Sequence, residues 1–455
     1  MKSIFKARSE AFFFLFLLII SLFATASVYL FRFNGPPIRS DGLGYYVYLP
    51  ATFIYNDISL NKFIDAYSKH YQDPVSNTWN GSTKYQDTNN YLNKYPVGVA
   101  VMSAPFFIIA HTITLILNNF INLPPDGFSS YLYHAAQSFS GTFYALLGLF
   151  ILKRILDKYF KLKTVYLTLI AITLGTNLFH YFTYDASFSH AYSFFLIALF
   201  LLLTIKWYKY PNVANSILIG ITSGLITIVR PTNIIIVILF LLWGISINKF
   251  KIDIKSLINL YINNYKNIVL ILISGLVVVF IQLLYWYLIT GKFLVYSYGE
   301  EGFNFANPQI INVLFSIRKG LFFWSPILLL ILPGLILLYK KLKKEFLSVI
   351  VVLIMNLWIV ASWWHWPYGG SFGMRALVDI LPIMAIPLGL SINWVLNLKN
   401  KKLKFGLLSL IIISILFTIF FMIQYWRGYV PIDGSNLETI LNVVQNKKGQ
   451  AQPVP

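Results

Sequence analysis

The segment NIVLILISGLVVVFIQLLYWYLIT, residues 267–290, contains no charged side chain. As an α-helix rising about 1.5 Å per residue, it is long enough to cross a hydrocarbon layer about 30 Å thick. Comparable apolar segments recur along the chain, with no soluble block between them. They lie near residues 11–31, 131–152, 164–183, 190–206, 213–229, 232–247, 321–339, 346–364, 376–396 and 405–425. The sequence therefore predicts an all-α polytopic membrane protein with about eleven transmembrane helices.

The composition leads to the same class. Of 455 residues, 57% are apolar and 11% are charged, whereas a soluble domain carries about a quarter charged residues. The chain has no Cys, which excludes disulfides and thiolate metal sites. An excess of 36 Lys and Arg over 16 Asp and Glu gives a net charge of +20. In a membrane protein this excess is expected in cytoplasmic loops, so we expect no nucleic-acid partner.

The distribution of basic residues predicts the topology. With a cytoplasmic N-terminus, 22 of the 36 Lys and Arg fall in short inner loops. A twelfth apolar segment, residues 96–118, would place every later basic loop outside if it crossed the membrane. We therefore expect it to lie along the outer surface or to re-enter. Residues 1–425 then form one transmembrane domain, residues 32–130 a large outer loop with juxtamembrane helices, and residues 426–455 a short polar outer tail.

Cations gather near the predicted outer face. Arg suits phosphate recognition because its planar fork can hold two oxygens at once. The cations within reach of this face are Lys94, Arg230, Arg318, Lys319 and Arg375. Asp379 follows Arg375 by four residues, so a helix would bring the two together as an ion pair. Such a pair neutralises itself near the interface, or it holds Arg375 toward a phosphate.

A polar site at one leaflet suggests a substrate that is half lipid and half polar. If a sugar moves from a lipid phosphate to a hydroxyl, the leaving phosphate needs only charge stabilisation. The attacking hydroxyl needs a base, and one carboxylate suffices. The anomeric centre then inverts, unlike hydrolysis by paired carboxyl groups. Asp41 is the first candidate for this base and Asp185 the second, although an Asp before Gly42 is also common in turns and helix caps.

Several other features have simpler explanations that stay open. His190 starts a predicted span and suits the interface, the acids Glu300 and Glu301 suit a solvated loop, and WWHWPYGG at residues 363–370 is typical of an aromatic belt. No His, Asp and Glu cluster has the spacing of a metal site, and no phosphate-binding glycine loop is present. We therefore expect no cofactor, while a divalent metal is not indicated but stays open.

Six motifs occur in a characteristic order. They are SDGLGYY at 40–46, NKYPVG at 93–98, GTNLFHYFTYDASFSHAYSFF at 175–195, RPTN at 230–233, SIRKGLFFWSPILLL at 316–330 and WPYGGSFGMRALVDILP at 366–382. The sequence resembles a group of bacterial membrane proteins in the GT-C glycosyltransferase superfamily, whose broader relatives include protein O-mannosyltransferases and lipid A aminoarabinose transferases. The resemblance implies a catalytic Asp at Asp41, a second juxtamembrane helix entered at Lys94–Pro96, and a later functional acid at Asp185. The family's usual Asp-Glu dyad is Asp41-Gly42 here, which leaves any metal requirement in doubt.

Together these observations predict a hexosyl- or pentosyltransferase in a bacterial cytoplasmic membrane, with its active site on the outer face. The donor would be a polyprenyl-phosphate-linked sugar and the acceptor a lipid, glycan or protein hydroxyl. The residues expected to bind the phosphate are Lys94, Arg230, Arg318 and Arg375, and those expected to line the sugar pocket are Tyr45, Tyr46, His190, Trp366 and Tyr368. The alternatives are a transporter or flippase of lipid-linked sugar and a non-enzymatic protein of envelope assembly.

Overall fold

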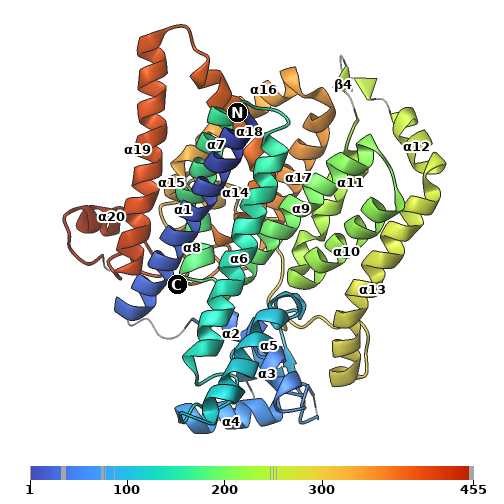
Figure 1. The fold of residues 1–455 in the computed structure, drawn as a ribbon, viewed down its shortest axis with the longest axis vertical. Helices are drawn as coiled ribbons and strands as arrows, with labels where there is room; N and C mark the ends of the chain where they lie inside the picture. The colour runs from blue at the N-terminus through green and yellow to red at the C-terminus, as the bar shows by residue number, and fades with distance from the viewer. Residues whose placement is uncertain are drawn as a thin grey trace.

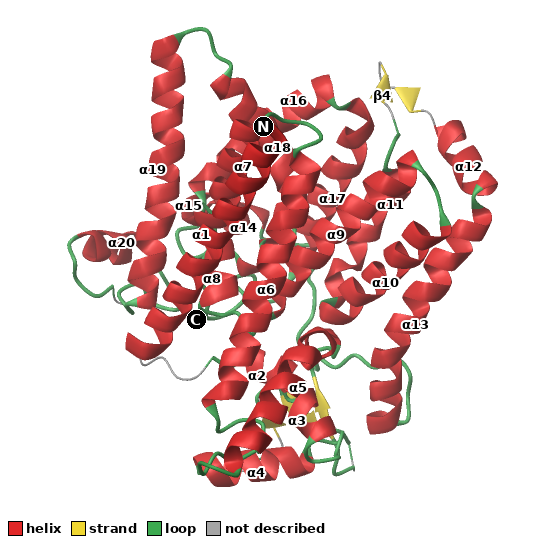
Figure 2. Ribbon diagram, viewed as in Figure 1, coloured by secondary structure: helices red, strands yellow, loops and turns green. Residues whose placement is uncertain are grey.

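The computed structural model describes residues 2–31, 37–72, 76, 78–86, 88–245, 247–248, 251–252 and 254–449. These residues are predominantly helical (Figure 2), which confirms the predicted all-α polytopic class. Within these described ranges, seven helices are long and apolar enough to cross a membrane. They are α1 (Lys2–Phe31), α5 (Gly98–Asn118), α6 (Tyr131–Leu156), α9 (Ser189–Lys209), α13 (Tyr265–Thr290), α17 (Lys343–Ser362) and α19 (Lys401–Trp426).

Shorter helices complete the bundle. Those with an apolar sequence of 10 to 17 residues include α7 (Leu162–Leu174), α10 (Val213–Val229), the continuous pair η1 (Pro231–Ile236) and α11 (Val237–Leu242), and α18 (Leu381–Leu396). The remaining helices are α2 (Asp41–Tyr46), α3 (Tyr48–Phe53), α4 (Asn61–Tyr71), α8 (Leu178–Thr183), α12 (Ile254–Asn263), α14 (Ile310–Phe315), α15 (Leu321–Trp324), η2 (Pro326–Leu330), α16 (Ile331–Lys341), η3 (Arg375–Leu377) and α20 (Leu437–Val444).

Three of the predicted spans are interrupted, and proline accounts for two of the breaks. Pro326 and Pro382 each stand in the first turn of a new helix, where the missing amide proton costs nothing. The third break separates α7 from α8 at residues 175–177. Apolar length alone could not show these breaks, because the flanking residues remain hydrophobic.

The helices at the centre of the bundle are buried, whereas those at its periphery expose apolar side chains. Most side chains of α9 and α18 are buried, whereas most apolar side chains of α13 and α19 are at least partly exposed. The helix α13 packs against α10 through small residues: a Cβ added at Gly220 would lie 1.9 Å from the Oγ of Ser274. Close approach through small residues is typical of helix packing in membranes.

The two ends of the molecule differ in composition. The basic α18–α19 connection and α12 lie at one end, together with the start of α1 (Figure 1). At the other end lie α2 to α5 and an antiparallel sheet of β1 (Thr78–Trp79), β2 (Ser82–Lys84) and β3 (Tyr91–Asn93), in that order. A separate hairpin joins β4 (Ile247–Asn248) to β5 (Lys251–Ile252). The helix α5 packs against α2, α3 and α6 at this second end, and its placement outside the bilayer stays a prediction.

Candidate active site

A cavity of about 400 Å³ opens where the α2–α5 unit meets the helix bundle. Its walls come from α2, the β3–α5 connection, the starts of α9 and η1, the loop after α13, and the loop between α17 and η3. The titratable side chains that line it are Asp41, Tyr45, Lys94, Tyr95, His190, Arg230, Tyr296, Tyr298, Glu301, His365, Tyr368 and Arg375. The structure thus brings together residues that lie more than 300 positions apart in the sequence.

Asp41 presents its carboxyl to this cavity from the first residue of α2. Its Oδ2 lies 2.9 Å from NH1 of Arg375, and its Oδ1 accepts a hydrogen bond of 2.8 Å from the hydroxyl of Tyr95. Burial of the carboxyl opposes ionisation, but Arg375 and the Tyr95 hydroxyl outweigh it and lower the pKa of Asp41. The carboxylate is therefore ionised at neutral pH.

The backbone around Asp41 is fixed by close packing. Ser40 has a φ of 47°, and its carbonyl oxygen accepts a hydrogen bond of 3.0 Å from the Nδ2 of Asn80. A Cβ added at Gly42 would lie 2.0 Å from the Oγ of Ser187, which itself donates to the carbonyl of Pro37. Position 42 consequently has no room for a side chain as long as Ser187 keeps its place.

Each of the three cations in the cavity already has a carboxylate partner. Arg375 pairs with Asp41, as described above. The Nζ of Lys94 lies 2.8 Å from Oε1 of Glu301. The NH1 of Arg230 lies 3.2 Å from Oδ2 of Asp379. The site is thus balanced in charge, and a bound phosphate would have to share these cations with the carboxylates.

Asp379 supports the cavity from behind. It is fully buried and accepts hydrogen bonds from Nδ1 of His190 at 2.8 Å, from Nδ2 of Asn233 at 2.8 Å and from Arg230. Because an ionised carboxylate only accepts, Nδ1 of a neutral His190 carries the proton and Nε2 is its acceptor. The predicted ion pair between Asp379 and Arg375 is wrong, since residues 375–377 form a 3-10 turn rather than the α-helix that the spacing assumed.

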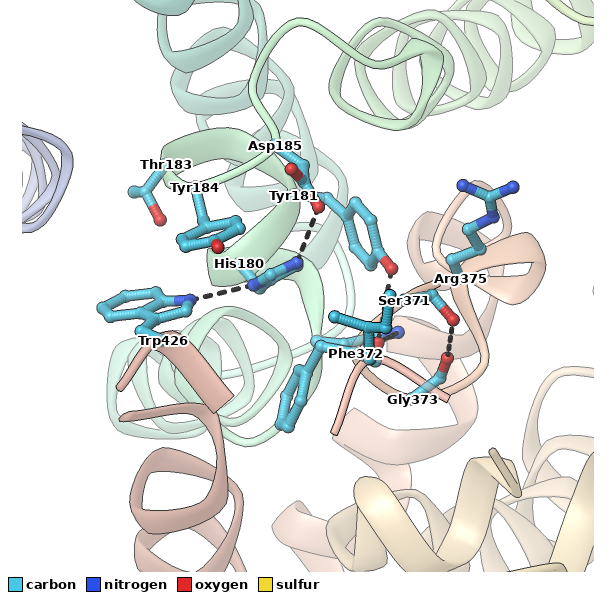
Figure 3. Close-up of polar contacts among 12 residues, drawn as sticks. His180, Tyr181, Thr183, Tyr184, Asp185, Ser371, Phe372, Gly373, Arg375 and Trp426 are labelled. Carbon is cyan, nitrogen blue, oxygen red and sulfur yellow. Dashed lines mark hydrogen bonds and ion pairs between the residues drawn. The ribbon is translucent and has the colours of Figure 1, made fainter. Parts of the chain in front are cut away.

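Asp185 lies behind the cavity wall rather than in it. Its Oδ2 is 3.0 Å from Nε2 of His180, and its Oδ1 is 3.3 Å from NH2 of Arg39. The Nδ1 of the same imidazole accepts a hydrogen bond of 2.9 Å from Trp426. Figure 3 shows Asp185, His180 and Trp426 of this cluster, with the guanidinium of Arg375 pointing away from them. Burial opposes ionisation of Asp185, but His180 and Arg39 lower its pKa.

Three other predicted site residues also lie outside the cavity lining. Arg318 forms a two-pronged ion pair with Asp433, with both N–O distances at 2.9 Å, and its guanidinium lies over the ring of Trp366. Tyr46 is buried and donates a hydrogen bond of 2.7 Å to the carbonyl of Gly127. The remaining candidates line the cavity: Asp41, Tyr45, Lys94, His190, Arg230, Tyr368 and Arg375.

Lys319 joins the C-terminal segment to the loop that precedes Arg375. Its buried Nζ donates to the carbonyl of Ser371 and, at 2.5 Å, to the carbonyl of Ile432. Burial lowers the pKa of Lys319 to about 7. The Lys319 ammonium thus serves as an internal clamp and does not reach the cavity.

Sequence reasoning missed several residues of the cavity. Tyr95 donates to Asp41 and Glu301 pairs with Lys94, whereas the sequence placed Tyr95 only in the entry to a juxtamembrane helix and Glu301 in a solvated loop. An isolated Tyr or a loop Glu carries no pattern of its own, although Tyr95 does fall inside the NKYPVG motif. The described residues contain no group of three His, Asp or Glu side chains that could hold a metal ion.

Comparisons with known proteins bear on the fold. No protein-family model matches the sequence, and no curated protein matches it significantly. The structure is similar to the archaeal oligosaccharyltransferase AglB from Archaeoglobus fulgidus, solved in complex with an inhibitory peptide and a dolichol-phosphate, at a TM-score of 0.50 and 12% identity. The similarity covers 98% of this chain. The chain has a GT-C fold.

The GT-C fold confirms what the six motifs implied about architecture. The apo form of the Archaeoglobus fulgidus oligosaccharyltransferase matches at a TM-score of 0.49 and 12% identity, over 97% of this chain and 60% of that chain. The chain likewise spans 60% of the length of the AglB chain. The likeness therefore describes the fold, and the chemistry must be argued from the cavity.

Proposed function

We propose that the protein is an inverting glycosyltransferase that moves a sugar from a polyprenyl-phosphate-linked donor to an acceptor hydroxyl. The observation that carries the proposal is that one cavity of a GT-C fold is lined by an ionised Asp41 together with Lys94, Arg230 and Arg375. One carboxylate and several cations are the groups that this reaction requires.

In the proposed step, the acceptor oxygen attacks the anomeric carbon as the bond from that carbon to the phosphate oxygen breaks. The electron pair leaves with the phosphate, whose added charge is stabilised by Arg230, Arg375 and Lys94. Asp41 takes the proton of the acceptor hydroxyl. A single displacement on the face opposite the phosphate inverts the anomeric centre. The product is a polyprenyl phosphate or equivalent lipid phosphate.

The cavity also suits a ligand that is partly lipid and partly sugar. Its lining includes the aromatic side chains of Trp286, Phe303, Trp363 and Trp364. Tyr45, His190 and Tyr368 line the polar part, where hydroxyl and imidazole groups can hydrogen-bond to a sugar. The similar archaeal enzyme was solved with a dolichol-phosphate, which is consistent with a lipid phosphate here. The acceptor class, whether lipid, glycan or protein, remains open in the proposal.

The placement of the cavity supports a site on the non-cytoplasmic side. The cavity lies at the α2–α5 end of the molecule, opposite the basic α18–α19 connection (Figure 1). If basic connections face the cytoplasm, the cavity faces outward. We therefore propose a multi-pass protein of a bacterial cytoplasmic membrane with an external active site.

The test is mass spectrometry of glycolipids and glycoproteins from cells that express the protein, the Asp41→Asn variant or no protein. The matched control is Asp65→Asn, which removes an exposed acid of the same outer unit that pairs only with Lys69 at the surface. We expect a sugar-bearing product with the native chain and with the control, and none with Asp41→Asn at equal amounts of folded protein. Full product formation by Asp41→Asn would refute the role of the base.

A further inference from the structure

The C-terminal segment beyond α19 forms a short helix with unusual surroundings. The helix α20 begins with a capping box, in which the side chain of Asn436 accepts from the amide of Thr439 and the hydroxyl of Thr439 accepts from the amide of Asn436. It runs crosswise to α19 and lies level with the second half of α19 (Figure 1). With eight residues it is too short to cross a bilayer.

The surface of α20 divides into three sides. One side, with Thr439 and Val443, is buried against the protein. A second side is apolar yet open: Leu437, Leu441 and Val444 are 61%, 53% and 62% exposed. Their spacing of four and three residues places them on one stripe of the helix. The third side is polar and exposed and contains Glu438 and Gln445.

The neighbourhood of α20 indicates what covers the apolar side. The helix α19, which precedes the connection to α20, exposes Leu416, Phe420 and Ile423, which are 57%, 40% and 43% accessible, so part of its surface is apolar and open, as expected of a helix that faces lipid. Ile432, in the connection to α20, is 68% exposed.

We propose that α20 is an interfacial helix, whose apolar side of Leu437, Leu441 and Val444 inserts into the leaflet on the cavity side of the bilayer. A helix at the membrane interface needs one apolar side that faces lipid and one polar side that faces water. The helix α20 has both, in addition to the side that packs against the protein. Lys447 and Lys448 follow the helix and are exposed, so they can contact lipid headgroups. The occupant of the apolar stripe is lipid, continuous with the lipid around α19.

This contact would connect the bilayer to the active-site cavity. The carbonyl of Ile432 accepts hydrogen bonds from Lys319 and from the amide of Ser371, and Asp433 holds Arg318. Ser371 belongs to the loop that leads to Arg375. The interfacial helix is therefore braced against the same segment that positions the partner of Asp41.

The absence of Cys from the sequence allows a direct test. Nitroxide labels are placed on Leu441→Cys and, as the matched control on the polar side, on Glu438→Cys in the full chain. The labelled proteins are reconstituted into vesicles of phosphatidylethanolamine and phosphatidylglycerol. We expect the ratio of oxygen accessibility to that of a water-soluble nickel complex to be several-fold higher at position 441 than at position 438.

Two results would overturn the proposal. Equal access of the nickel complex to both positions would place α20 in water. Inaccessibility of position 441 to both reagents would mean that protein, and not lipid, covers the apolar stripe. In that case, spin–spin broadening that disappears on dilution with unlabelled chains would show that the covering protein is a second copy of this chain. Loss of transferase activity plays no part in either reading, so the test is independent of the proposed function.

Discussion

Two carboxylates near the cavity have similar partners but different exposure. Asp41 pairs with Arg375 and accepts from Tyr95, and it faces the cavity. Asp185 pairs with Arg39 and His180, is 7% exposed and lies behind the cavity wall. Both are single acids near the start of a helix at the same end of the molecule. The comparison shows that access to a ligand makes an acid a candidate catalytic residue. The charged partners of an acid do not by themselves tell a catalytic residue from one that stabilises the fold.

The largest expected effect separates the two acids by what each loss changes. Asp41→Asn should reduce transfer by about 10²- to 10⁴-fold, the usual contribution of a general base, and should cost less stability than Asp185→Asn, because the Asp41 carboxyl is the more exposed of the two. The measurement is product formation by purified protein, next to thermal unfolding in detergent. Unfolding of Asp41→Asn at a much lower temperature would instead make Asp41 a structural residue.

Asp185→Asn should act chiefly on stability. Removing its charge takes away the carboxylate that both Arg39 and His180 contact in a largely buried cluster, and breaking a buried ion pair in this way costs about 3–5 kcal/mol. Thermal or denaturant unfolding of the purified variant measures the loss. Native stability combined with a complete loss of activity would contradict the supporting role and would return Asp185 to the catalytic candidates.

A smaller effect concerns the pH dependence of Asp41. Because Arg375 lowers the pKa of this carboxyl, Arg375→Gln should raise the pKa. A base must be ionised, so activity should then be lost at a higher pH on acidification than in the native protein. Arg375→Lys keeps the charge and should shift the acid limb less. The measurement is the transfer rate as a function of pH at saturating donor. If the rate of Arg375→Gln falls on acidification at the same pH as that of the native protein, Asp41 is not the titrating base.

The smallest effect is expected at the cavity rim. Lys94 and Glu301 form a partly exposed ion pair, so each single substitution should change the free energy of unfolding by about 1 kcal/mol or less. Lys94→Gln should weaken donor binding and raise KM, whereas Glu301→Gln should leave Lys94 available and lower KM. Steady-state kinetics of both variants test this. A rise in KM for both would mean that the pair itself shapes the site.

Part of this site could be predicted from the sequence. Hydrophobic length placed the main helices, and the motif order pointed to the GT-C fold and to Asp41. The sequence also predicted Arg230 and Arg375 as site residues, because both are cations near the predicted outer ends of apolar helices. The partner of each cation was not predictable, since Asp379 meets Arg230 only after α10 and the 375–377 turn pack together. Likewise, nothing in a single sequence shows that Asp185 faces His180 instead of a cavity.

The contact between Gly42 and Ser187 limits how this protein can change. Any side chain at position 42 meets the Ser187 hydroxyl and its Cβ, at 2.0 and 2.7 Å from the added carbon. Introducing an acid next to Asp41 would require Ser187 to become Gly first, because the reverse order forces α2 or the Ser187 segment to move. An evolutionary or engineered route to a two-carboxylate site therefore has a fixed sequence of steps, and its first step lies 145 residues away from the position that it serves.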